Sequence, residues 1–231
     1  MSKLVPAGLI ALALVPSVAG AVRIGSLANG DAPARFADMP APVVVHIVGA
    51  LIYSLVGAFQ FDAAFRRRRR AWHRRTGRVV VVAGLAVALS GAWMTLLSDL
   101  PDHDGVIVNA TRVVVSAVMA YGLVAAVVAI RRRDIRRHRA WMIRAYALAL
   151  GAGTQAFVLG PVAALDGGQP GVTGRTIGML LGWAINVAVA EWIIRRPGRS
   201  RPAGSAHPAH GRFRGSRRLP TVDGSNEIPA N

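Results

Sequence analysis

The stretch Val79-Val-Val-Val-Ala-Gly-Leu-Ala-Val-Ala-Leu89 decides the fold, because its eleven residues are uncharged and do not alternate between polar and apolar. Eight arginines precede it, between positions 66 and 78. A transmembrane β-strand would alternate polar and apolar side chains over about ten residues. An uninterrupted apolar run beside a basic segment instead predicts a membrane-spanning helix, which satisfies its own backbone hydrogen bonds in hydrocarbon.

Five further stretches have a similar length and composition, and a bilayer core needs about 20 apolar residues as a helix. The six predicted spans run from about 4 to 22, 43 to 61, 79 to 98, 113 to 130, 145 to 165 and 176 to 194. Residues 1–195 therefore predict an all-α domain, a polytopic bundle of six transmembrane helices. Residues 196–231 are rich in Pro, Gly, Ser and Arg and predict a disordered basic tail.

The basic residues are distributed unevenly along the chain, whose formal net charge is +17. All but four of the 28 lysines and arginines fall on one side of the six-span arrangement; the four are Arg23, Arg35, Arg112 and Arg175. Basic loops stay in the cytoplasm, so the pattern predicts a multi-pass protein of the cell membrane with both termini cytoplasmic (N-in, C-in). Arginines at span ends favour anionic lipid headgroups as partners and argue against nucleic acid.

The first span has an alternative interpretation as a secretory signal peptide. Lys3, the apolar run and the small residues Ala19-Gly20-Ala21 resemble a signal with its cleavage site. The run is long for a signal and its start is weakly charged, so we expect residues 1–22 to remain as a span. The chain has no cysteine, which excludes disulfides, thiolate metal sites and iron–sulfur clusters.

A group of histidines and arginines at the predicted cytoplasmic ends of spans three and five is the first candidate site. Its members are His73, Arg74, Arg78, His138, Arg139 and Arg144. We expect them to converge into one pocket for a lipid headgroup or a small anion. Two histidines at equal depth could alternatively hold a haem iron. Span four offers no histidine for a second haem unless His103 serves, and the sequence leaves the cofactor open.

A second set of polar residues lies within or near the spans. It consists of His46, Tyr53, Gln60, Arg112, Gln155 and Asn186. Because an unpaired polar group in a membrane is costly, we expect a structural hydrogen bond for His46 and interhelical hydrogen bonds for Gln155 and Asn186. Proton relay is the alternative role for His46. Glu191 is expected to pair with Arg195 one turn away. No catalytic motif is recognisable, so the sequence assigns no enzymatic activity.

Four motifs resemble those of one family. They are His46-x-x-Gly49, Gly57-Ala-Phe-Gln-Phe61, His73-Arg-x-x-Gly-Arg78 and His138-Arg-x-Trp-Met-Ile-Arg-x-Tyr-Ala147. Over roughly residues 4–195 the chain resembles the predicted membrane proteins grouped as domain of unknown function 2306 (DUF2306). The resemblance implies a multi-helix bundle with these His and Arg positions as its signature, and no particular activity. Three hypotheses remain: headgroup or small-anion binding, electron transfer through haem on His73 and His138, and proton-coupled transport using His46.

Overall fold

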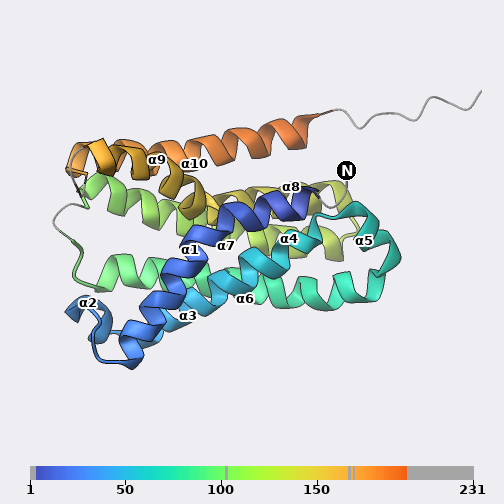
Figure 1. Ribbon diagram of the computed structural model, residues 1–231. Coiled ribbons are helices and arrows are strands. Elements are labelled where there is room, and N and C mark those ends of the chain that lie inside the picture. Colours follow the sequence, from blue (N-terminus) through green and yellow to red (C-terminus); the bar gives the residue numbers. More distant parts are fainter. Residues whose placement is uncertain (1–3, 102–103, 166–167, 169, 197–231) are drawn as a thin grey trace, which may run out of the picture. The chain divides into compact units, whose positions relative to one another are not determined.

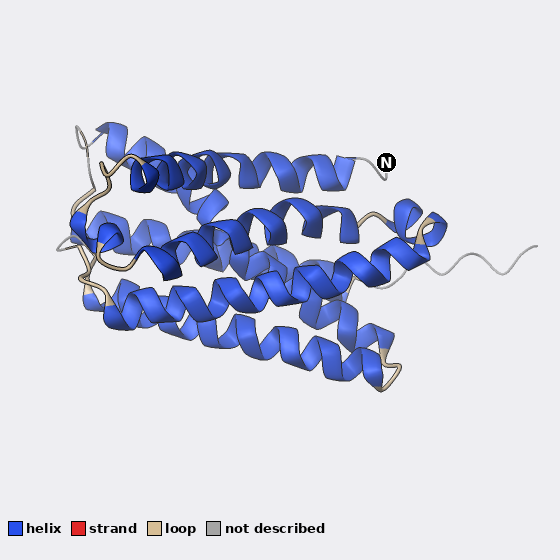
Figure 2. Cartoon of the chain, turned by 90° about the horizontal axis from the view of Figure 1, so that it is seen from below, coloured by secondary structure: helices blue, strands red, loops and turns tan. Residues whose placement is uncertain are grey.

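The computed structural model describes residues 4–101, 104–165, 168 and 170–196, which form helices and turns without a strand (Figure 1; Figure 2). The helices are α1 (Leu4–Ala28), α2 (Ala34–Ala37), α3 (Pro40–Leu51), the π-helix η1 (Ile52–Val56), α4 (Gly57–Gln60), α5 (Ala63–Arg68), α6 (Arg70–Leu97), α7 (Val106–Arg131), α8 (Ile135–Ala149), α9 (Gly151–Leu165) and α10 (Val172–Arg195). Residues 197–231 of the predicted tail and His103 lie outside the described residues.

The bundle has two ends that differ in charge. Figure 1 places α2 at one end and α5 at the other. We call the end with residues 29–39 and α2 the arginine-poor end. We call the end with residues 61–69 and α5 the arginine-rich end. The four arginines that the sequence places apart from the rest belong to the helices and turns of the arginine-poor end.

Six stretches of helix within the described residues are long and apolar enough to cross a membrane, which confirms the all-α class and the number of spans predicted. They are Leu4–Ala28, Pro40–Gln60, Arg70–Leu97, Val106–Arg131, Ile135–Ala164 and Val172–Arg195. Each overlaps one predicted span. Large apolar side chains lie on the surface, and Val82, Leu89 and Leu96 on α6 are 67%, 64% and 65% exposed. A continuous apolar surface of this kind is expected to face lipid.

Two of the spanning helices begin nine or ten residues before their apolar runs. α6 starts at Arg70 and α8 at Ile135, whereas the apolar runs begin near positions 79 and 145. Arginine is a good helix former, so the helix continues through the basic segment. Asp134 fixes the start of α8, because its carboxylate accepts a hydrogen bond from the backbone N–H of Arg137 at 2.9 Å.

The spans pack in a closed order around a small core. α1 contacts α3, α3 contacts α6, α6 contacts α7, α7 contacts α8, α8 contacts α10, α10 contacts α9, and α9 returns to α1. Tyr53 of η1, Leu123 of α7 and Tyr146 of α8 are buried at the centre. The Tyr146 hydroxyl donates to the Ser54 carbonyl oxygen at 2.6 Å. This bond ties α8 to the π-helix, a rare geometry that often occurs near functional sites.

Glycines let α9 approach its two neighbours closely. Pro16 in α1 has no N–H, so the Leu12 carbonyl oxygen loses its usual helical donor. Gly153 of α9 lies against this oxygen, and a Cβ at position 153 would collide with it. On the other side, a Cβ at Gly182 of α10 would lie 2.5 Å from Gln155 Cγ. These two approaches fix the position of α9 and therefore of Gln155.

Candidate functional site

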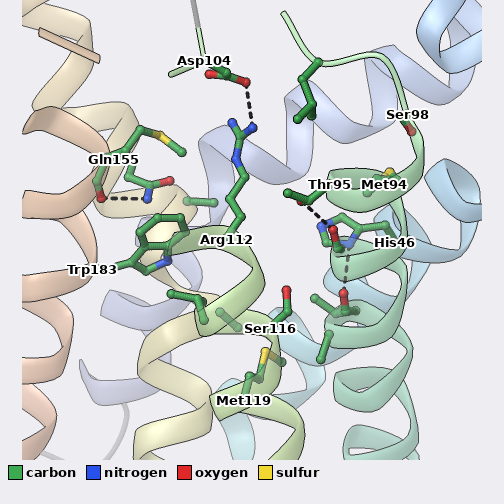
Figure 3. A pocket seen from close by; sticks show the side chains of 18 of the residues that line it. His46, Met94, Thr95, Ser98, Asp104, Arg112, Ser116, Met119, Gln155 and Trp183 are labelled. Atoms are coloured by element: carbon green, nitrogen blue, oxygen red, sulfur yellow. Dashed lines mark hydrogen bonds and ion pairs between the residues drawn. The ribbon is translucent and has the colours of Figure 1, made fainter. Parts of the chain in front are cut away.

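A cavity of about 440 Å³ lies at the arginine-poor end and extends inward between the helices (Figure 3). It reaches from Asp104, in the turn before α7, to Met119 near the middle of that helix. Figure 3 shows His46 on one side of the cavity and Trp183 on the other. Small-molecule sites occupy about 300–1,000 Å³, so this cavity can hold a small ligand. Its polar lining consists of Arg35, His46, Thr95, Ser98, Asp99, Asp104, Arg112, Ser116, Gln155 and Arg175.

A buried carboxylate holds two of the guanidinium groups. Asp104 Oδ2 accepts a hydrogen bond from Arg112 Nη1 at 2.7 Å, and its Oδ1 accepts one from Arg175 Nε. Arg112 also donates to Asn109 Oδ1 at 3.0 Å. The Asp104 side chain is only 2% exposed. Burial alone would raise the pKa of the Asp104 carboxyl, but the hydrogen bonds from Arg175 and Arg112 hold that pKa below its usual value.

Arg35 adds a third guanidinium group that is not neutralised in the same way. It stacks over the Phe36 ring with its Cζ 4.6 Å from the ring centroid, and Arg23 lies over the same ring at 4.4 Å. The Arg35 Nε is buried and has no hydrogen-bond partner among the described residues. Burial and the charges of Arg23, Arg112 and Arg175 lower the pKa of Arg35 in spite of the nearby carboxylate. Arginine stays protonated, so positive charge is in excess among the described residues that line the cavity.

His46 presents one ring nitrogen to α6. Its Nδ1 lies 3.1 Å from the Val87 carbonyl oxygen and 3.1 Å from Ser90 Oγ. A carbonyl oxygen only accepts, so the bond to Val87 requires a hydrogen on Nδ1. Gly91 makes room for the ring, because a Cβ there would lie 3.3 Å from His46 Cε1. The structural hydrogen bond expected for His46 is therefore present, while a relay role stays a prediction.

A second cavity of about 160 Å³ lies between α1, α3, η1 and α9. Tyr53 lines it, and the Tyr53 hydroxyl is buried without a hydrogen-bond partner among the described residues. The two cavities share His46, Val87, Ala149 and Ala152. His46 therefore forms part of the wall that separates them.

The comparison with known protein families adds one finding. The family described as "Predicted membrane protein (DUF2306)" matches residues 43–194, which is more than half of the chain. The chain belongs to the DUF2306 family. No curated protein and no solved structure matches it. The DUF2306 match covers His46, Asp104, Arg112 and Arg175 and does not reach Arg35.

The histidines of two of the motifs lie near the arginine-rich end. His73 belongs to α6 and His138 to α8, and both helices pack against α7. His138 Nδ1 lies 3.0 Å from the Ala126 carbonyl oxygen. Three arginines of the predicted group are exposed: Arg74, Arg78 and Arg139. Headgroup, anion or haem binding by these residues stays a prediction.

Two other predicted side chains near this end bind neighbouring helices. Arg144 donates to both carboxylate oxygens of Glu191 on α10, at 2.6 and 3.1 Å. Glu191 also pairs with Arg195 at 3.3 Å, which confirms the ion pair predicted one turn apart. Gln60 Nε2 donates to Thr76 Oγ1 at 2.7 Å. Arg144 is thus turned toward α10.

The deeper amides connect the helices of the last two spans. Gln155 Nε2 donates to the Met179 carbonyl oxygen at 3.0 Å. Asn186 Nδ2 donates to the Ala147 carbonyl oxygen at 3.1 Å, and Asn186 Oδ1 accepts from Thr154 Oγ1 at 2.8 Å. The interhelical hydrogen bonds expected for Gln155 and Asn186 are therefore present. Gln155 in addition lines the large cavity.

The sequence alone identified only part of this cavity. The predicted polar set contains three of its members: His46, Arg112 and Gln155. The residues that complete its charged lining are absent from both predicted sets: Arg35, Asp99, Asp104 and Arg175. One signal could have found them. Only four arginines fall on the arginine-poor side of the predicted arrangement, and three of them line one cavity.

Proposed function

We propose that this DUF2306 protein binds a small anion in the cavity at the arginine-poor end. One observation carries the proposal: three guanidinium groups converge on a cavity whose described lining holds two carboxylates, Asp99 and Asp104. Asp104 partly neutralises Arg112 and Arg175, whereas Arg35 forms no ion pair with a described residue. A bound anion would supply the missing negative charge.

The chemistry of the cavity supports this function. A guanidinium group donates paired hydrogen bonds to carboxylate, sulfate or phosphate oxygens. Apolar walls weaken the screening by water, so the positive potential is focused inside the cavity. The Arg35 Nε, which has no partner among the described residues, is one donor that a ligand could use.

Binding to the full-length chain in nanodiscs of zwitterionic lipid tests the proposal. Acetate, chloride and inorganic phosphate are titrated at constant ionic strength, and binding is followed by the fluorescence of Trp183, which lines the cavity. The Trp183→Phe variant supplies the background signal of the other tryptophans. Arg35→Gln should weaken the binding of whichever anion binds by about tenfold or more, because a charge-assisted hydrogen bond contributes roughly 1.5–3 kcal/mol.

Arg23→Gln is the matched control. It makes the same charge change beside the same Phe36 ring, but Arg23 does not line the cavity. We expect its affinity to stay within about threefold of the wild type, since long-range attraction is screened. Equal weakening by both variants, or wild-type affinity in Arg35→Gln, would contradict a specific site at Arg35.

We further propose that the protein lies in the cell membrane with the arginine-rich end and both termini in the cytoplasm. All but four of its 28 basic residues support this orientation, and anionic headgroups are the proposed partners of that end. The chain has no cysteine, so Asn29→Cys and Arg132→Cys each give a single label site. A membrane-impermeant maleimide should label the first on intact cells and the second only after lysis. The reverse pattern would contradict the orientation.

A further inference from the structure

We propose that the anion is a monocarboxylate whose apolar body occupies the inner part of the cavity. This inference rests on the proposed anion-binding function and names its substrate class. The charge of the lining is the first argument. Among the arginines and aspartates of the described lining, three guanidinium groups face two carboxylates, which leaves one positive charge. A monoanion neutralises that charge, whereas a dianion would leave a net negative charge beside the buried Asp104 carboxylate.

The inner wall is the second argument. Below the guanidinium groups most of the lining side chains are apolar, and the polar side chains His46, Thr95, Ser116 and Gln155 lie among them (Figure 3). The apolar side chains include Val87, Val115, Met119, Leu148, Met179 and Trp183. Chloride and phosphate have no apolar part that could be buried against these side chains. An alkyl or aryl group attached to the carboxylate would gain free energy there by leaving water, and methionine side chains adapt readily to such groups.

The charged end and the apolar inner part of the cavity together determine the orientation of the bound ligand. The carboxylate faces the arginine-poor end, where Arg35, Arg112 and Arg175 meet, and the apolar body points toward Met119 near the middle of α7. A short acid from solution and a fatty acid from the bilayer share this chemistry. The volume of about 440 Å³ is finite, so chain length distinguishes the two sources.

A chain-length series measured on the full chain in zwitterionic nanodiscs tests the inference. The probes are acetate, butanoate, hexanoate and dodecanoate, with hexanol, hexanamide and inorganic phosphate for comparison. Each buried methylene should tighten binding by about fourfold, so hexanoate should bind on the order of 100-fold more tightly than acetate. Arg35→Gln should weaken acetate and hexanoate by the same factor. A plateau before dodecanoate indicates a soluble acid, and a continued rise indicates a fatty acid; both support the class.

Filling the inner wall provides a second measurement. Val115→Phe places a larger side chain in the cavity, whereas Val114→Phe changes a neighbouring residue that is 58% exposed and outside the cavity lining. Val115→Phe should lower the ratio of hexanoate affinity to acetate affinity, whereas Val114→Phe should leave that ratio at the wild-type value.

Two results would overturn the inference. Equal affinity for acetate and hexanoate, or Arg35-dependent binding of phosphate that is tighter than that of hexanoate, would refute the monocarboxylate class and leave small-anion binding in place. Absence of binding for every anion in the series would refute the proposed function together with the inference.

Discussion

Replacing Asp104 with asparagine should destabilise the protein and make its stability depend on anions. The Asp104 side chain is 2% exposed and binds both Arg112 and Arg175. Asparagine keeps the size of the side chain and removes its charge. Two guanidinium groups, which are 23% and 20% exposed, then lose their counter-charge beside Arg35.

The expected loss in the free energy of unfolding follows from how deeply Asp104, Arg112 and Arg175 are buried. Removing one member of a fully buried ion pair costs about 3–5 kcal/mol, whereas an exposed pair contributes about 0–1 kcal/mol. The carboxylate is buried but water reaches the guanidinium groups, so we expect Asp104→Asn to lower the free energy of unfolding by about 2–3 kcal/mol. In a chain of this size 1 kcal/mol shifts Tm by roughly 2–4 °C, so Tm should fall by about 4–12 °C.

Thermal unfolding in detergent, followed by tryptophan fluorescence, measures the effect. An anion that binds the folded state should stabilise it by about 2.7 kcal/mol at one hundred times its Kd. At one fixed anion concentration the stabilisation should be larger in Asp104→Asn than in the wild type, because the added positive charge lowers the Kd. Asp99→Asn is the control, because Asp99 lines the same cavity and has no ion pair with a described residue. Equal Tm values for the two variants, with no response to anions, would refute the role of Asp104 as counter-ion.

Three further predictions concern the pH dependence of stability, an ion pair between helices and the packing of a glycine. The folded pKa of Asp104 lies below the value of 3.8 that is usual for aspartate, so its stabilising contribution is complete above that value and lost as pH falls through the folded pKa; Tm measured from pH 7 to 3 should fall more in the wild type than in Asp104→Asn. Arg144→Gln and Glu191→Gln should be coupled by about 1 kcal/mol in a double-mutant cycle, and additive losses of stability would refute the pair. Gly182→Ala should lower the free energy of unfolding by about 1–3 kcal/mol, because a Cβ there would lie 2.5 Å from a side-chain carbon of α9; Gly160→Ala, with open space around it, should not.

The class of fold and the number of spans could be predicted because they depend on local composition. Twenty apolar residues need hydrocarbon around them wherever the rest of the chain lies. The positions of the helix ends depend instead on helix propensity and on capping hydrogen bonds. Arg70 and Ile135 begin helices outside the apolar runs, since helix propensity and the Asp134 cap decide where a helix starts. Hydropathy therefore locates the membrane-crossing part of a helix better than its ends.

The charged end of the cavity could not be predicted, because its contacts join distant parts of the chain. Asp104 and Arg175 are 71 positions apart and meet only when the turn before α7 lies beside α10. The helix order that brings them together is set by side-chain packing, which no local pattern reports. His73 and His138 differ, since each stands in a conspicuous motif at the same predicted depth and both helices pack on α7.

The distribution of arginine contains a signal for the cavity that the sequence motifs lack. At the arginine-rich end, a basic residue follows from the preference of membrane proteins for positive cytoplasmic loops, so it needs no further reason. At the arginine-poor end, each arginine is contrary to that preference. Its presence there therefore needs a local structural or functional reason. Three of the four line the cavity, and the fourth, Arg23, shares the Phe36 ring with Arg35. An arginine placed against the topological preference is therefore a stronger indication of a binding site than an arginine within a basic cluster.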